Sequence, residues 1–170
     1  MITGIGGISR SGKSFLAQKL KESLERDGKT VSVLDLDDYV FLEKDIPLIR
    51  DHIDWEVPES IDWNRFLEAI TKAEEIFDHV IVEGLMVFWN SSIRALYNKL
   101  IFIEISRDEF MHRKQSDLRW GKEPDWYVEY IWDSYLKYGQ LPDGMDMDLT
   151  LDGELSFDIE MIFRGIFDVS

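Results

Sequence analysis

The sequence predicts an α/β fold in which a five-stranded parallel sheet carries helices on both faces. The main observation is that apolar runs typical of buried strands alternate about five times with segments of helical spacing. The chain has 170 residues, of which 45% are hydrophobic, enough for one domain with its own core. It contains no internal repeat, linker or low-complexity tract, so a single domain spanning residues 1–170 is expected.

Five segments have the pattern of strands. The first is an apolar run that ends in glycines, and the last alternates apolar residues with acids. The predicted strands are 2–6, 30–36, 79–83, 100–105 and 146–152.

The predicted helices lie between these strands. The first, 14–26, places Phe15, Leu16, Leu20 and Leu24 on one face and ends at Asp27-Gly28. Asp62 is expected to cap the N-terminus of the next helix. The remaining helices are 63–77, 91–98, 107–119, 125–138 and 157–167, and residues 39–62 are expected to be an irregular, functional loop.

Composition excludes several classes of protein. The net charge of −15 repels polyphosphate backbones, so nucleic acid is not an expected partner. No apolar run approaches the roughly 20 residues that a membrane-spanning helix needs. The absence of cysteine excludes disulfides and thiolate metal sites. With no signal-peptide pattern at the N-terminus, we expect a cytoplasmic protein, either a monomer or a weak dimer.

The segment after the first strand matches the phosphate-binding pattern G-x-x-x-x-G-K-[ST] in full. Its residues are Gly7, Ile8, Ser9, Arg10, Ser11, Gly12, Lys13 and Ser14, and Phe15 follows them at the start of the helix. Glycines let the backbone wrap closely, so that its N–H groups and the N-terminus of the helix point at phosphate oxygens. Lys13 is expected to reach the β- and γ-phosphates of ATP, and the Ser14 hydroxyl to bind Mg²⁺. The fold class is therefore a P-loop NTPase.

Acids follow the second and third predicted strands. Asp37 and Asp38 come at the end of one, and Glu83 ends the other. Ligands of open α/β sheets bind at the carboxyl ends of the strands, so a carboxylate there can accept a proton from a substrate hydroxyl. Glu83 stands where an acid that contacts Mg²⁺ is expected. Alternatively, the aspartates cap a loop and Glu83 is a solvated strand end.

With these motifs placed, the sequence resembles the uridine kinase-like family of P-loop nucleoside kinases, and within it the nicotinamide riboside kinases. The resemblance runs nearly end to end. After the phosphate loop it is carried by Leu36-Asp37-Asp38-Tyr39, by the segment from Trp55 to Asp62, by Ile81-Val82-Glu83-Gly84-Leu85, by the segment from Trp132 to Tyr138, and by Leu151-Asp152-Gly153.

The resemblance implies roles for individual residues. Asp38 corresponds to the catalytic base, Glu83 to the acid that organises Mg²⁺, and Asp37 to a further metal-binding acid. Trp55 and Glu56 correspond to a pair, usually Tyr-Asp, that binds the nucleoside, with the acid on the ribose hydroxyls. Trp126 and Tyr127 stand where the family places aromatic residues beside the nucleobase, although their helical spacing also fits a core stripe.

A cationic lid is expected at about residues 107–125. Arg113 matches the lid arginines of the family, Lys114 stands where another arginine is common, and Arg119 is a second candidate. These cations precede a Gly-Pro break, which is the pattern of a mobile lid, but Arg119 also fits a solvated helix face.

These observations predict an ATP-dependent kinase that uses Mg²⁺ and phosphorylates the ribose 5′-hydroxyl of a nucleoside. The catalytic residues are then Asp38, Lys13 and Arg113, and nicotinamide riboside is the favoured acceptor. Three alternatives stay open: uridine or cytidine as the acceptor, another small alcohol such as pantothenate or a sugar, and a regulator that binds ATP without turnover.

Overall fold

The protein is described here by a computed structural model, which covers residues 1–117, 123–142 and 144–167. The strands of its main sheet are β1 (Ile2–Gly7), β2 (Val31–Asp35), β5 (His79–Gly84), β6 (Lys99–Glu104) and β7 (Leu149–Asp152). They lie in the order β2-β5-β1-β6-β7, and every neighbouring pair is parallel. The predicted five-stranded parallel sheet is confirmed.

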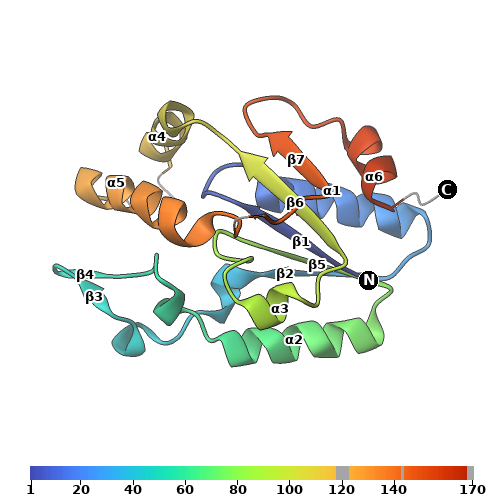
Figure 1. Cartoon of the computed structure of the whole chain (residues 1–170), viewed down its shortest axis with the longest axis horizontal. Helices are drawn as coiled ribbons and strands as arrows, with labels where there is room; N and C mark the ends of the chain where they lie inside the picture. The colour runs from blue at the N-terminus through green and yellow to red at the C-terminus, as the bar shows by residue number, and fades with distance from the viewer. Residues whose placement is uncertain (118–122, 143, 168–170) are drawn as a thin grey trace.

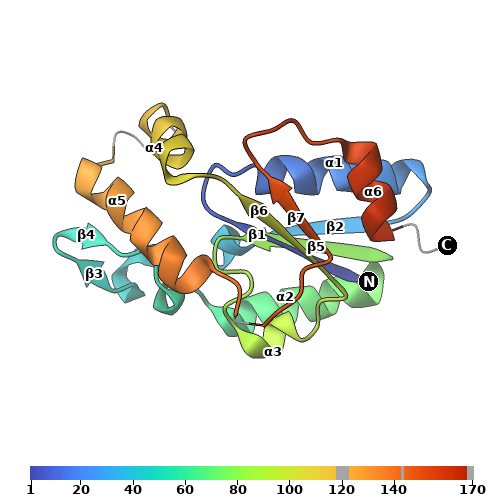
Figure 2. The ribbon, with the colours of Figure 1, turned by 45° about the horizontal axis from the view of Figure 1, so that its top comes forward.

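Helices cover both faces of this sheet. One face carries α1 (Lys13–Arg26) and α6 (Ile159–Phe167), and the other carries α2 (Trp63–Ile76), α3 (Ser91–Arg94) and α5 (Asp125–Ser134) (Figures 1 and 2). The remaining helix, α4 (Arg107–Gln115), stands beyond the carboxyl ends of the strands. Among the described residues no helix is both long and apolar enough to cross a membrane.

The core is divided by the sheet into two clusters, because successive side chains of a strand point to opposite faces. Along β5, Val80 and Val82 belong to the cluster beneath α2, α3 and α5, whereas Ile81 belongs to the cluster beneath α1 and α6. All three side chains are fully buried. This double burial explains why the strand is a continuous apolar run rather than an alternating one.

Residues 39–62, predicted to be irregular, contain more structure than the sequence indicates. A hairpin of two very short antiparallel strands, β3 (Leu48–Ile49) and β4 (His52–Ile53), projects beside α5. Short 3₁₀ turns flank it at Leu36–Tyr39, Glu43–Asp45 and Pro58–Ser60. Strands of two residues are too short to show any periodicity, which is why the sequence does not predict this hairpin.

Several helices are also shorter than predicted. The helix expected at 91–98 ends at Arg94, and the one expected at 107–119 ends at Gln115. The segment predicted as a helix over 125–138 is α-helical only to Ser134 and continues as a π turn at Tyr135–Gly139. The expected lid region therefore comprises α4 and the start of α5, with residues 118–122 outside the described part of the chain.

Replacing Phe66 by alanine should destabilise the protein by about 3–5 kcal/mol, because it leaves a cavity in the core. Phe66 lies on α2, is fully buried, and packs its ring against that of Tyr39 with centroids 5.0 Å apart. Urea denaturation gives the free energy of unfolding. Ile76 on the same helix is 71% exposed and provides the control, since Ile76→Ala should change stability by less than about 0.5 kcal/mol. Equal effects of the two substitutions would contradict this packing.

Candidate functional site

The phosphate loop connects the central strand β1 to α1, where its conformation depends on residues with positive φ. Gly7 has φ 148°, Arg10 66° and Gly12 106°. A Cβ atom on Gly7 would lie 2.5 Å from the carbonyl oxygen of Ile103, so no larger residue fits there. Among the described residues no side chain caps the N-terminus of α1, so the N–H groups of its first turn are available to an anion.

Lys13 and Ser14 lie beside Glu83, as the sequence predicts. Burial raises the pKa of Glu83, while the Lys13 ammonium and a hydrogen bond with the Ser14 hydroxyl partly offset that rise. The Nζ of Lys13 donates to the carbonyl oxygen of Ile8 at 2.9 Å, inside the loop. The buried hydroxyl of Ser11 has no hydrogen-bond partner among the described residues. A polar oxygen left unpaired within a phosphate loop is consistent with a place for a ligand there.

Three aspartates gather next to Glu83. Asp35 ends β2 and is the register partner of Glu83 on β5, and the turn Leu36–Tyr39 carries Asp37 and Asp38 onward from it. Burial, followed by the charges of Asp37 and Glu83, raises the pKa of Asp35 to about 7. Since Asp37 and Asp38 also raise the pKa of Glu83, all four carboxyl groups lie within electrostatic reach of one another.

These residues fit Mg²⁺ only together with a nucleotide. No group of three or more acids and histidines among the described residues is arranged to hold a metal ion by itself. Mg²⁺ usually binds one or two carboxylates and completes its octahedron with phosphate oxygens and water. The hydroxyl of Ser14, the last residue of the phosphate loop, and the carboxylate of Glu83 beside it are a donor set of that kind.

A second group of acids lies around Glu56, in the turn after β4. Asp54 is buried, accepts a hydrogen bond from the Tyr130 hydroxyl at 2.8 Å, and accepts another from the backbone N–H of Glu56 at 3.2 Å. Burial is the main cause that raises the pKa of Glu56 to about 8, and the charge of Asp37 is the next. The Lys114 ammonium acts in the opposite direction. Glu56, predicted to bind substrate, therefore lies within reach of both Asp37 and the lid helix.

The aromatic residues predicted beside the substrate form one wall. Tyr127 is buried, and its hydroxyl donates to the carbonyl oxygen of Ile53 on β4 at 3.4 Å. The ring of His52 packs against Tyr127 at 4.1 Å between centroids and against Trp126 at 6.0 Å. Trp126 is partly exposed and lies under the Arg50 guanidinium at 4.3 Å. Trp126 is thus the more exposed of the two rings, whereas Tyr127 supports the wall from within.

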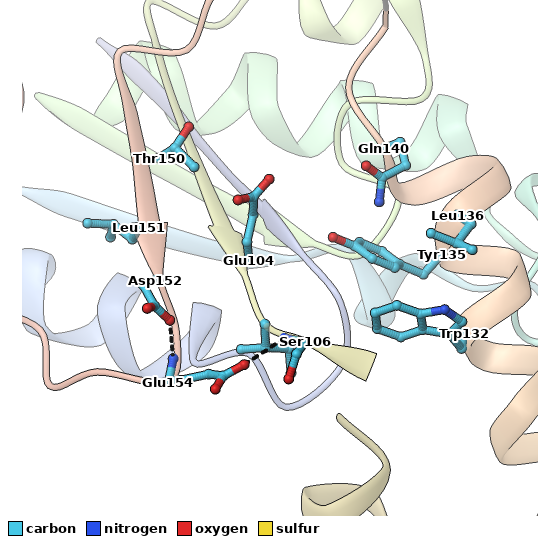
Figure 3. A pocket seen from close by; sticks show the side chains of 11 residues that line it. Glu104, Ser106, Trp132, Tyr135, Leu136, Gln140, Thr150, Leu151, Asp152 and Glu154 are labelled. Carbon is cyan, nitrogen blue, oxygen red and sulfur yellow. Dashed lines mark hydrogen bonds between the residues drawn. The ribbon is translucent and has the colours of Figure 1, made fainter. Parts of the chain in front are cut away.

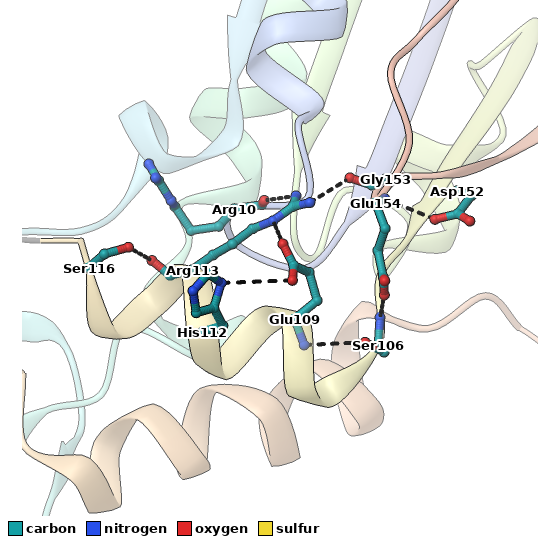
Figure 4. Close-up of polar contacts among 9 residues, drawn as sticks. All are labelled: Arg10, Ser106, Glu109, His112, Arg113, Ser116, Asp152, Gly153 and Glu154. Atoms are coloured by element: carbon teal, nitrogen blue, oxygen red, sulfur yellow. Dashed lines mark hydrogen bonds and ion pairs between the residues drawn. The ribbon is translucent and has the colours of Figure 1, made fainter.

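Arg113 contacts the phosphate loop directly. From α4, its guanidinium donates to the carbonyl oxygens of Arg10, at 3.0 Å, and Gly153, at 2.9 Å, and it pairs with Glu109 (Figure 4). The side chain of Ser106 caps α4 by accepting a hydrogen bond from the backbone N–H of Glu109. The predicted lid cation is therefore oriented next to the site where a triphosphate would lie.

The other predicted lid cations differ in their surroundings. Lys114 is 8% exposed and forms an ion pair with Glu123 at 2.8 Å. Its positive charge is directed toward the acids around Glu56 rather than toward solvent. Arg119 lies outside the described residues.

Some residues at the site were not predicted from the sequence. Phe157, from the segment after β7, packs on the phosphate loop so closely that a Cβ on Gly12 would lie 3.0 Å from its ring. It also faces Phe15, which is 56% exposed, with 6.4 Å between ring centroids. No sequence signal marks Phe157. Asp35, in contrast, could have been found as a third acid at the end of the same strand as Asp37.

Two open hollows are lined by residues outside the phosphate loop. One, of about 510 Å³, is bounded by β6, β7 and α5, and Figure 3 shows Glu104, Asp152 and Glu154 on one side and Trp132, Tyr135 and Gln140 on the other. Because carboxylates line it, this hollow does not suit a polyphosphate. The other, of about 530 Å³, lies between Phe41 and Trp63. Neither is lined by the loop that binds phosphate.

The chain is similar in sequence to known kinases. The chain is 22% identical over 185 residues to nicotinamide riboside kinase 1 of Rattus norvegicus, covering 98% of this chain and 92% of the relative. It is 28% identical over 144 residues to uridine kinase of Leuconostoc citreum, covering 69% of each chain. No protein-family model matches the chain.

The fold also resembles that of solved kinases. A structure named "possible uridine kinase" from Bacillus stearothermophilus superposes with a TM-score of 0.59 at 18% identity, covering 89% of this chain and 88% of the other. This similarity confirms the predicted P-loop kinase fold. Together with the curated relatives, it identifies a nucleotide-binding transferase of the kinase class.

Replacing Glu56 by glutamine should weaken the dependence of stability on pH. The pKa of Glu56 is about 8 in the folded protein against 4.5 as its ordinary value, so the folded state holds a proton that the unfolded chain releases. This contribution to stability is complete below pH 4.5 and is lost as the pH rises to about 8. Within that window the wild type should lose up to about 1.4 kcal/mol more per pH unit than the variant.

Denaturation with urea between pH 4.5 and 9 measures this difference. At the acidic end both side chains are neutral, so similar stabilities of the two proteins there serve as the control. Parallel curves across the whole range would contradict the assignment of this proton to Glu56.

Proposed function

We propose that this chain, an ATP-dependent phosphotransferase similar to uridine kinases and nicotinamide riboside kinases, transfers the γ-phosphoryl group of ATP to the ribose 5′-hydroxyl of a nucleoside. Nicotinamide riboside is the favoured acceptor. The proposal includes a cytoplasmic enzyme that acts as a monomer or weak dimer.

One observation supports this proposal above the others: Asp37 lies within electrostatic reach of both halves of the site. Its charge raises the pKa of Glu83, beside the phosphate loop, and also that of Glu56, beside the aromatic wall. The proposal places the meeting of a nucleotide held by the loop and an acceptor held at Glu56 near the turn that carries Asp37 and Asp38. Phosphoryl transfer requires this meeting of donor and acceptor.

Each residue then has a defined task in the transfer. Asp38 accepts the proton of the substrate 5′-hydroxyl while the 5′-oxygen attacks the γ-phosphorus of ATP. The bond from the γ-phosphorus to the β–γ bridging oxygen breaks, and that oxygen leaves as part of ADP. Lys13 exchanges its bond to the Ile8 carbonyl for the phosphate oxygens, and Arg113 adds a second positive charge. Mg²⁺, held by Ser14 and Glu83 with the phosphates, would neutralise charge on the β- and γ-oxygens.

Charge favours a cationic acceptor. The acids Asp37, Asp54 and Glu123 act on this part of the site around Glu56, and Lys114 is a cation that opposes them there. A positively charged pyridinium ring should bind more tightly in these surroundings than a neutral pyrimidine, because the acids attract it. Glu56 is proposed to bind the ribose hydroxyls, while Trp55 and Trp126 contact the base.

A panel of nucleosides tests the function. With Mg-ATP, purified protein should release ADP in the presence of nicotinamide riboside, and more slowly with uridine or cytidine, as measured by a coupled assay. Lys13→Ala should lower kcat by about 100-fold or more, since it removes a charge that stabilises the transition state. ATP binding without a phosphorylated product for any acceptor would favour the non-catalytic alternative.

The nature of the acceptor can be tested at Glu56. Glu56→Ala should raise KM for ribonucleosides at least about tenfold, because the hydrogen bonds of the Glu56 carboxyl group to the diol are lost. A 2′,3′-dideoxynucleoside lacks that diol and serves as the matched control, with a much smaller change expected. If both acceptors respond equally, or only pantothenate or a sugar is turned over, the ribose assignment is wrong.

Asp38→Asn should lower kcat by about 10²–10⁴-fold and leave KM for ATP nearly unchanged, because it removes the general base but not the phosphate loop. Asp37→Asn is the companion variant, since both acids lie on the same turn. It should affect the Mg²⁺ dependence of the reaction more than the chemical step. The opposite result, with the larger loss of kcat in Asp37→Asn, would transfer the role of base to Asp37.

A further inference from the structure

Asp35 has no role in the mechanism above, yet it contacts the turn on which that mechanism depends. It is the last residue of β2, and its carboxylate accepts a hydrogen bond from the backbone N–H of Asp37 at 3.0 Å. This bond caps the 3₁₀ turn Leu36–Tyr39, which carries both Asp37 and Asp38. Asp35 therefore acts on the backbone from which the two acids project.

The far end of the same turn is also held in place. Arg65 donates to the carbonyl oxygen of Asp38, and the backbone N–H of Asp62 donates to that of Tyr39 at 2.8 Å. These contacts come from α2 and the residue that caps it. The turn is thus anchored on one side by α2 and on the other by Asp35.

A turn of four residues depends strongly on such anchors. It has too few internal hydrogen bonds to hold its own shape, and its first N–H groups need acceptors from outside. Leu36 is buried and packs so closely on β5 that a Cβ on Gly84 would lie 2.6 Å from the Leu36 Cβ. Packing therefore fixes where the turn starts, while the bond from Asp37 to Asp35 determines how the backbone leaves the strand.

We infer that Asp35 is a positioning residue for phosphoryl transfer: its carboxylate oxygen orients Asp37 and Asp38 toward the phosphate loop by accepting the Asp37 N–H. The inference rests on the proposed function, because it assigns Asp35 a part in that reaction. What the reaction needs from Asp35 is an acceptor oxygen at this position. An asparagine side chain supplies the same oxygen.

The test compares Asp35→Ala with Asp35→Asn. The alanine variant loses the acceptor, so kcat should fall about tenfold or more, whereas KM for ATP should stay within about twofold because the phosphate loop is intact. The asparagine variant should restore kcat to within about threefold of the wild type. A residue needed only for folding would not show this separation of kcat from KM.

Asp78 provides a matched control at the other end of β2. Its carboxylate accepts the backbone N–H of Thr30 at 2.8 Å, a bond of the same kind far from the acids of the site. Asp78→Ala should lower Tm but leave kcat unchanged.

Three results would overturn the role of Asp35 alone, provided that the wild type phosphorylates a nucleoside. The first is an unchanged kcat in Asp35→Ala, and the second is an equal loss of kcat in Asp78→Ala. The third is an Asp35→Asn variant as impaired as Asp35→Ala, which would show that the charge of Asp35 matters rather than its hydrogen bond. A wild type inactive on every nucleoside of the panel would overturn the proposed function and the role of Asp35 with it.

Discussion

The site depends on the register in which three parallel strands pair. β5 lies between β1 and β2, so that Glu83 is the partner of Ile5 on one side and of Asp35 on the other. The phosphate loop leaves β1 two residues beyond Ile5, and the turn with Asp37 leaves β2 directly after Asp35. Because parallel strands end at the same edge, segments distant in sequence arrive side by side. A shift of one residue in this pairing would turn Glu83 to the other face.

At this edge of the sheet, local positive groups must bind an anionic nucleotide although the protein as a whole is strongly acidic. The chain carries a net charge of −15, and burial together with neighbouring carboxylates raises the pKa values of Asp35, Glu56 and Glu83. A polyanion can bind only where local positive groups outweigh that field. The protein provides them as Lys13, Arg113 and the uncapped N-terminus of α1. A bound nucleotide with its metal would in turn screen the acids from one another.

The elements that the sequence predicted well are those with a strong local signal. Apolar runs predicted four strands of the sheet, an alternating pattern predicted the fifth, and the glycines with Lys13 predicted the phosphate loop. The sequence does not predict the β3–β4 hairpin, because strands of two residues are too short to show a periodic apolar pattern. It also does not predict that α4 ends at Gln115, because no glycine or proline marks that position. His52 shows the same limit, because its ring contacts that of Tyr127 through its position on β4 of this hairpin.

Sequence by itself determined the fold class, the phosphate loop and the resemblance to nucleoside kinases, because glycine spacing, apolar runs and motif order are properties of neighbouring residues. Only the tertiary structure showed that Asp35 caps the turn of Asp37, that Phe157 backs Gly12, and that Arg113 reaches the backbone of the loop. The contacts of Phe157 and Arg113 join residues that are more than 100 positions apart in the sequence. The cap at Asp35, in contrast, is a local contact. That cap depends on where β2 ends and on which way its last side chain turns, and packing across the sheet determines both.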